Sequence, residues 1–272
     1  MLFAVLLISL VLQALDLTIT RLLEGYWERR PARWLAELLK LWHQWRWYRL
    51  QARAEHELPT MREGALWQMR YRYPAPDRMM PTGLGNVLRA AEDRAGQTYG
   101  LQTVEVWPRL FPLLSERLTA IVEDERNQLD LAVRLCFVFM VGALASATVL
   151  IRQMLAANTL ADRWKWLVIP AANLVLSLLS YRGAVSGALL YGTGLDTAFA
   201  LHRFDLLVAL HLPLPQNLDQ ERRVNGRISN LFQYGAGSPA ERRAIVYCHP
   251  AAREGQAGAA DATAGPPAAA SP

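Results

Sequence analysis

Cysteine, lysine and charge are all scarce in this sequence. The two cysteines, Cys136 and Cys248, are too few for the disulfide-stapled domains of small secreted proteins. Charged residues make up 19% of the 272 residues, below the roughly 25% of an ordinary soluble domain. The apolar fraction of 52% is too high for a wholly disordered chain, and the sequence has neither the repeat of collagen nor that of a coiled-coil rod.

Catalytic and metal-binding motifs are also missing. No histidine lies four residues from another histidine or cysteine, and H-E-x-x-H, C-x-x-C, P-loop and G-x-S-x-G patterns do not occur. The glycines of Gly83-Leu84-Gly85 stand at an expected helix start, where free backbone amides could bind a phosphate. This motif alone is weak evidence for such a site. We therefore expect no catalytic residue, no cofactor and no metal, and we predict that the protein is not an enzyme.

Three long apolar segments dominate what is present. Residues 2–20, 131–151 and 166–191 form runs of 19, 21 and 26 residues, against the roughly 20 that a membrane-spanning helix needs. The first has neither a basic start nor a small-residue cleavage site, so an uncleaved anchor is predicted. A buried core helix of a soluble protein is the alternative for the other two. The fold class predicted is mainly α: a helical integral membrane protein with about three spans and a helical cytoplasmic region.

The basic residues predict the orientation. Residues 21–53 hold eight Lys and Arg, whereas the 152–165 loop holds three. The positive-inside rule places the larger group in the cytoplasm, at the inner (plasma) membrane of a bacterial cell. The predicted regions are an anchor (1–20), a juxtamembrane helix (21–57), a cytoplasmic region (58–130), a transmembrane hairpin (131–191), cytoplasmic helices (192–235) and a disordered Ala/Gly/Pro-rich tail (236–272).

Two arginines lie in the apolar segments. Arg134 is one turn inside the second segment, and we expect its side chain to extend to the lipid headgroups. Arg182 lies nine residues before Tyr191. Either the hydrocarbon boundary falls near Tyr181-Arg182, or Arg182 faces a polar interior and is a functional candidate.

A tryptophan-rich helix is predicted around residues 32–50. Trp34, Leu38, Leu41, Trp45 and Tyr48 recur at helical spacing. Three interpretations are open: a helix in the headgroup layer, a helix whose aromatic face packs on the cytoplasmic body, and a nucleic-acid contact, which the balanced charge of residues 54–130 makes unlikely. The residues assigned to the membrane interface are Trp34, Trp42, Trp45, Trp47, Arg134 and Arg182.

Local signals place the remaining elements. Thr82 is expected to cap a helix whose inward residues include Leu84, Val87 and Ala91, and Ser115 to cap one that continues into the second span. Residues 101–107 alternate enough to predict a short strand. Asn217 begins a capping box for a last helix that ends near Gly235.

Small residues line one face of the third segment. Gly183 and Gly187 form a G-x-x-x-G pattern, and Ala184 and Ala188 repeat the spacing. Such residues let helix backbones approach closely. The face packs either against the second segment of the same chain or against another copy.

Several stretches resemble a group of uncharacterised bacterial polytopic membrane proteins. They are Pro81-Thr82-Gly-Leu84-Gly85-Asn86, Trp107-Pro108-Arg109-Leu110, Tyr181-Arg182-Gly-Ala-Val and Arg203-Phe204-Asp205-Leu206-Leu207. The resemblance covers about residues 80–235. It implies a membrane architecture and no particular activity.

Three functions remain open at this point. The favoured one is a non-enzymatic membrane scaffold or accessory subunit that docks a cytoplasmic partner. The second is an oligomeric channel or membrane-disrupting effector. The third is a membrane-bound enzyme acting on a lipid or an isoprenoid, with His202, Asp205 and Asp196 as its only candidates. The expected partners are the lipid bilayer and either a protein partner or a second copy of the chain.

Overall fold

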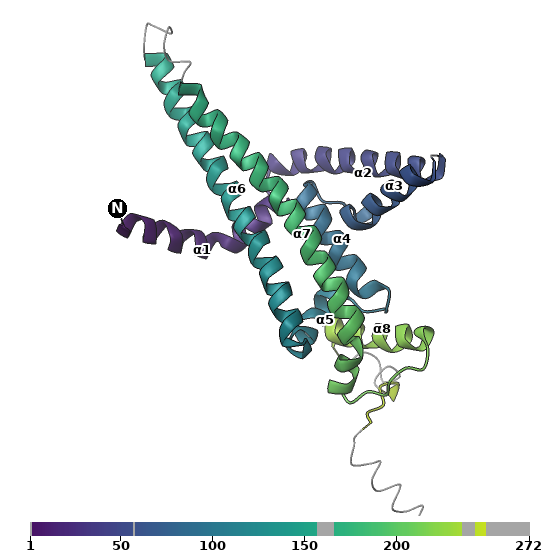
Figure 1. Cartoon of the computed structure of the whole chain (residues 1–272). Coiled ribbons are helices and arrows are strands. Elements are labelled where there is room, and N and C mark those ends of the chain that lie inside the picture. The colour runs from purple at the N-terminus through teal and green to yellow at the C-terminus, as the bar shows by residue number, and fades with distance from the viewer. Residues whose placement is uncertain (1, 57, 157–165, 236–242, 249–272) are drawn as a thin grey trace, which may run out of the picture. The chain divides into compact units, whose positions relative to one another are not determined.

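The computed structural model describes residues 2–56, 58–156, 166–235 and 243–248. These residues are mainly helical and contain no strand, so the predicted fold class is correct in its helical part (Figure 1). The helices are α1 (Leu2–Glu24), α2 (Ala32–His56), α3 (Pro59–Arg72), α4 (Gly83–Gln97), α5 (Thr103–Leu110), α6 (Glu116–Ala156), α7 (Val168–Ala209) and α8 (Leu218–Tyr234), with single 3₁₀ turns at Pro76–Arg78 and Phe111–Leu113.

The chain divides into two compact units. The first comprises residues up to Ala95 and residues 115–198, and the second comprises residues 96–114 and the chain from Phe199 onward. Helix α7 contributes residues to both units. The predicted disordered tail, 236–272, lies outside the described residues except for positions 243–248.

In the first unit, α6 and α7 pack side by side and antiparallel. The Ser177 hydroxyl of α7 donates a hydrogen bond to the Cys136 carbonyl of α6 (3.0 Å). Further along, a Cβ added at Gly187 would lie 3.3 Å from the Cα of Leu129. Along the contact, the residue numbers on α7 increase while those on α6 decrease. The two helices are therefore antiparallel and form the predicted hairpin. Residues 157–165 of its connecting loop lie outside the described residues.

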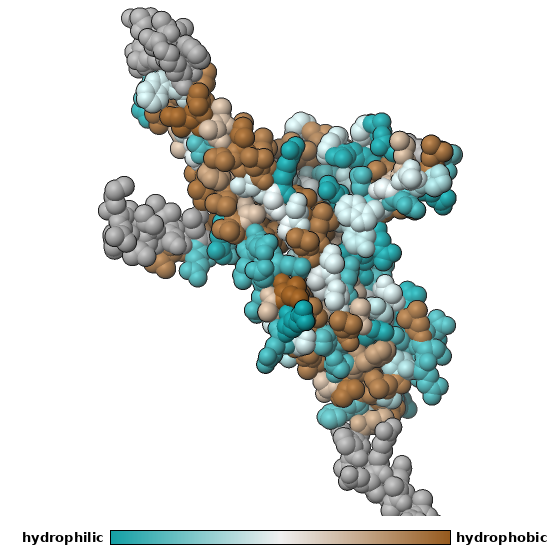
Figure 2. Space-filling model, in the orientation of Figure 1, coloured by the Kyte–Doolittle hydropathy of each residue, from teal (hydrophilic) through white to brown (hydrophobic). Residues whose placement is uncertain are grey.

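The hairpin is long and apolar on its surface. Among the described residues, α6 and α7 are the two helices that are long and apolar enough to cross a membrane. Only 11% of an apolar 18-residue stretch in each helix is buried. Hydrophobic side chains gather over the paired helices (Figure 2). This exposure argues against the core helix of a soluble protein, which would be mostly buried. Most side chains of the first apolar segment lie outside the described part, so its predicted span stays a prediction.

The core of the first unit brings α1, α4, α6 and α7 together. Its buried side chains are Ile19, Leu84, Val87, Leu129, Val133, Ala184 and Ala188. Helix α4 therefore uses the inward face that was predicted for it. At the start of α6, the Leu118 amide donates to the Ser115 hydroxyl (3.4 Å), so the expected cap and continuous helix are both present.

Helices α2 and α3 form a second hairpin within the first unit. Leu50 and Ala54 of α2 pack with Ala65 of α3 and with Tyr73 and Met79, which follow α3. Trp47 packs against this cluster from its edge. The pair therefore has its own small apolar core.

The second unit contains α5, α8 and the end of α7. The strand predicted at residues 101–107 is wrong, because Thr103–Leu110 is helical. Tertiary contacts of its buried face, which includes Val106 and Leu110, override the β-propensity of Val and Thr. Helix α8 begins as predicted, with the Gln220 amide donating to the Asn217 side chain (2.9 Å), and ends at Gly235, which has a φ of 78°.

Candidate functional site

Charged and aromatic side chains meet at one level of the α6–α7 hairpin. Given the antiparallel register, Arg134 of α6 lies at about the height of Tyr181 and Arg182 of α7. The guanidinium of Arg134 donates to both carboxylate oxygens of Asp16 in α1 (2.7 and 2.8 Å). A bidentate pair of this kind fixes orientation as well as adding energy. We call this level, defined by Asp16, Arg134, Tyr181 and Arg182, the polar collar.

Sequence reasoning assigned Arg134 to the headgroups but missed its partner Asp16. A signal was present, since each is a single charge inside an otherwise apolar run. Arg182 is exposed on α7. Arg182 therefore does not face the interior of the described chain, and the boundary near Tyr181-Arg182 stays a prediction.

The N-terminus of α4 is attached to the polar collar. The Leu84 amide donates to the Tyr181 hydroxyl (3.1 Å), and the Gly85 amide donates to the Thr82 hydroxyl (3.0 Å). The Thr82 hydroxyl in turn donates to the Glu24 carbonyl at the end of α1 (2.7 Å). Thr82 is thus the expected cap. The suggested phosphate site at Gly83-Leu84-Gly85 is not supported, because protein groups already accept the amide protons of Leu84 and Gly85.

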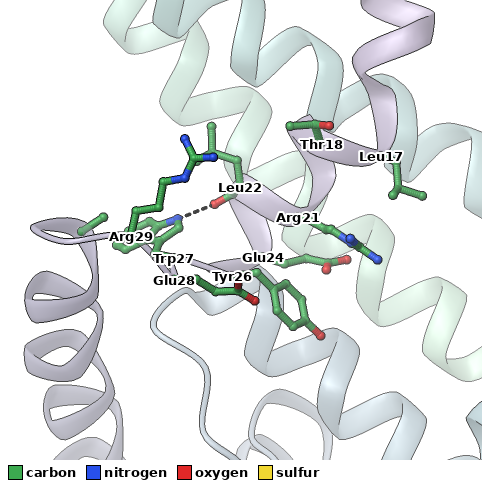
Figure 3. Close-up of a pocket in the computed structure, with 10 residues that line it drawn as sticks. Leu17, Thr18, Arg21, Leu22, Glu24, Tyr26, Trp27, Glu28 and Arg29 are labelled. Atoms are coloured by element: carbon green, nitrogen blue, oxygen red, sulfur yellow. Dashed lines mark hydrogen bonds between the residues drawn. The ribbon is translucent and has the colours of Figure 1, made fainter.

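A cleft opens where α1 turns into α2. It has a volume of about 860 Å³ and is lined by residues from Leu17 to Ala32. Figure 3 shows Arg21 and Arg29 on this turn together with Glu24 and Glu28, while the Trp27 indole N–H donates to the Leu22 carbonyl (2.8 Å). Because arginine and glutamate are equally represented, the cleft does not select a ligand of one charge.

The middle of α2 lies against the polar collar. A smaller, mostly apolar cavity of about 480 Å³ is lined by Trp42 and His43 of α2, by Pro81, and by Tyr181 of α7. Burial, assisted by nearby Arg46, lowers the pKa of His43 to about 4, although a hydrogen bond with the Pro81 backbone opposes the shift. The imidazole is therefore neutral at pH 7 and serves as a packed, uncharged contact.

The outer face of α2 consists of Trp34, Leu38, Leu41, Trp45 and Tyr48. These side chains are 43–70% exposed, although the helix forms as predicted. The buried residues of α2 are Ala36, His43, Leu50 and Ala54 on the opposite side. Within the part of the chain that the structure describes, this aromatic face is therefore not packed on the rest of the protein.

The other two tryptophans assigned to the membrane interface lie beside this face. Trp42 is exposed, and the guanidinium of Arg46 lies 5.0 Å from its ring centre. Trp47 is only partly exposed and packs toward α3. On the outer face itself, Arg49 lies 4.6 Å from the ring centre of Trp45.

The three candidate catalytic residues already have hydrogen-bonding partners. Asp196, in the first unit, accepts a hydrogen bond from Arg94 (2.7 Å), whose guanidinium also lies 4.3 Å from the ring centre of Tyr71. His202 and Asp205, in the second unit, contact each other at 2.7 Å across one turn of α7. A contact between side chains three residues apart on one helix is common on helix surfaces.

The small residues of α7 lie toward the interior of the chain. Ala184 and Ala188 are completely buried in the core with α4 and α6. Gly187 allows the close approach to Leu129, while Gly183 lies at the edge, 3.8 Å from the Ala132 methyl group when a Cβ is added. Packing within one chain accounts for three of the four residues.

Among the residues that the structure describes, no group of three or more His, Cys, Asp or Glu side chains is placed to hold a metal ion. Comparison with protein-family models, with curated proteins and with solved structures found no match to this chain. The resemblance to bacterial polytopic membrane proteins stays a prediction.

Proposed function

We propose that this protein is a non-enzymatic scaffold or accessory subunit of the bacterial inner membrane, which docks a cytoplasmic partner. The α6–α7 hairpin would cross the bilayer, with α1 as a third span. Above the polar collar, α6 is apolar from Leu135 to Ile151, about 25 Å at 1.5 Å per residue. That length is near the lower limit for a span.

The polar collar supports the position of the boundary. Tyrosine and arginine side chains are typical of the interface between hydrocarbon and water. The eight basic residues of 21–53 then lie on the same side as α4 and the turn between α1 and α2, against three in the opposite loop. This asymmetry supports a cytoplasmic location for that side.

One observation carries the scaffold interpretation: charged side chains of α6 and α7 bind charged side chains of other helices of the same chain. Arg134 binds Asp16 of α1, and Asp196 binds Arg94 of α4. A channel or effector that self-associates through the small residues of α7 is less well supported, because Ala184 and Ala188 are already covered by the chain's own α4 and α6.

A crosslinking pull-down from native membranes tests this proposal. The tagged full-length protein is crosslinked in its own host, solubilised gently and analysed by mass spectrometry. We expect one soluble cytoplasmic protein to be enriched reproducibly over a tagged unrelated inner-membrane protein. Recovery of the protein alone would contradict the scaffold, and recovery of crosslinked copies of the chain would favour the oligomeric alternative.

A further inference from the structure

We propose that the outer face of α2 lies in the headgroup layer and binds anionic lipid. This inference rests on the proposed function, because it needs the α6–α7 hairpin to cross the bilayer. It adds a lipid-binding surface and a lipid class to the scaffold.

The first argument is the exposure of the outer face. Trp34, Leu41 and Trp45 are 70%, 61% and 53% exposed. The opposite side of α2 packs with α3 and the segment after it. A row of tryptophan and leucine that no described residue of the first unit covers would be unfavourable in water, since such side chains gain about 1.5–3 kcal/mol each on full burial.

The second argument is the height at which α2 is held. Trp42 and His43 line one cavity with Pro81 and Tyr181, and Tyr181 belongs to the polar collar. The Gln44 side-chain amide also donates to the Pro76 carbonyl (2.8 Å), which fastens the same stretch of α2 to the segment before α4. The middle of the helix is therefore fixed at the level where the headgroups of a bilayer around the hairpin would lie.

The third argument is charge. Seven basic residues and three acidic ones lie between positions 28 and 56. Arg46 and Arg49 lie over the rings of Trp42 and Trp45. An arginine stacked on tryptophan presents an apolar surface and a phosphate-binding fork together. This combination fits the anionic surface of a cytoplasmic leaflet, where each basic residue contributes about 1 kcal/mol.

The test places spin labels on the full-length protein in lipid nanodiscs. Cys136→Ala and Cys248→Ala provide the background, and single cysteines are introduced as Leu41→Cys, Trp45→Cys, Glu63→Cys and Val138→Cys. Accessibility to oxygen and to a water-soluble nickel chelate is measured in discs of phosphatidylcholine with or without phosphatidylglycerol. We expect positions 41 and 45 to favour oxygen, more strongly with phosphatidylglycerol, while position 63 on exposed α3 favours the nickel chelate.

Position 138, on the exposed apolar surface of α6, separates this inference from the proposed function. Oxygen access at 138 with nickel access at 41 and 45 would overturn the lipid-binding face and leave the membrane scaffold standing. Nickel access at 138 as well would contradict both. Protection of 41 and 45 from both reagents would indicate a protein partner or a second copy, and would also overturn the inference.

The lipid class is tested with Arg46→Gln combined with Arg49→Gln. We expect this variant to lose the phosphatidylglycerol dependence of the oxygen access at position 41. The matched control is Arg62→Gln combined with Arg72→Gln on α3, which removes the same charge from exposed positions. An unchanged lipid dependence in the α2 variant, or an equal loss in the control, would contradict specific binding by α2.

Discussion

At the polar collar, the ion pair between Asp16 and Arg134 is expected to contribute to the stability of the protein. It joins α1 and α6 through two residues that are 118 positions apart in sequence. Hydrogen bonds to charged groups contribute about 1.5–3 kcal/mol, whereas exposed ion pairs contribute little. Here the two side chains are 28% and 41% exposed, so an intermediate effect is expected.

Asp16→Asn should therefore destabilise the protein by about 1–2 kcal/mol, measured as a lower thermal midpoint in detergent. The double exchange Asp16→Arg with Arg134→Asp should recover part of the loss, because the two opposite charges are restored. Glu37→Gln, which breaks the exposed pair with Lys40, serves as the control and should change stability by less than about 0.5 kcal/mol. Equal effects in both variants would argue against a special role for the pair.

His43 makes stability depend on pH. Its pKa is lowered to about 4 in the folded protein, from an ordinary value of 6.5. Protonation therefore favours the unfolded chain, and stability should fall as the pH decreases from about 6.5 toward 4, by at most about 3 kcal/mol. Thermal midpoints measured across this range for the parent and for His43→Gln check the effect. The variant should show the shallower slope, even if its midpoint is lower throughout.

At the scale of elements, the joint between α1 and α4 depends on a missing side chain. A Cβ at Gly85 would collide with the carbonyl oxygen of Glu24. The same carbonyl accepts the Thr82 hydroxyl, so it has little freedom to move. Gly85 thus lets the end of one helix lie directly on the start of the next.

Gly85→Ala should cost about 3 kcal/mol or more, since overpacking of a tight contact forces backbone shifts. Gly64→Ala is the matched control, because nothing lies within 4 Å of a Cβ added there. Alanine at this exposed position in the middle of α3 should stabilise the protein by about 0.5–1 kcal/mol. Thermal unfolding of both variants in the same detergent gives the comparison, and a neutral Gly85→Ala would refute the close joint.

The sequence allowed the helices and their caps to be predicted better than the contacts that each helix makes. The α2 periodicity was evident, but hydropathy cannot distinguish an apolar face that meets lipid from one that meets protein. Ala36 and Ala54 are buried on the inner side of α2. Alanine is small and only weakly hydrophobic, so the sequence does not mark this side as buried. Helix α5 was mistaken for a strand because its Val and Thr residues favour strands locally, whereas contacts distant in sequence decide its structure.

At the scale of the whole molecule, the antiparallel hairpin has a consequence for topology. The segment between α1 and α6 and the segment after α7 must share a compartment if both helices of the hairpin cross the membrane. Run length and charge clusters were enough to predict the hairpin. The joint with α1 was missed although Asp16 and Arg134 are the single charges of their apolar runs, because pairing them requires a contact between positions distant in sequence.

Single cysteines test the topology in intact cells. Leu58→Cys, Ala157→Cys and Ala240→Cys are made in the background lacking Cys136 and Cys248 and treated with an impermeant thiol reagent. Only position 157 should be labelled, since three basic residues on its side face eight on the other. Labelling at 58 and 240 alone would invert the orientation. Labelling at just one of those two would break the shared compartment.

The close contacts along α6 also constrain how the lengths of these helices can change. Leu129 and Cys136, which meet α7 at Gly187 and Ser177, are seven residues apart, and Val122, which lies 3.3 Å from a Cβ added at Gly194, is seven residues earlier. One inserted residue would rotate everything beyond it by about 100° and turn Arg134 away from Asp16. Seven inserted residues would nearly preserve the facing side chains, provided that α7 lengthens by the same amount, about 10 Å at 1.5 Å per residue. Relatives of this chain should therefore differ in α6 by whole heptads, and should carry their other insertions in the loops.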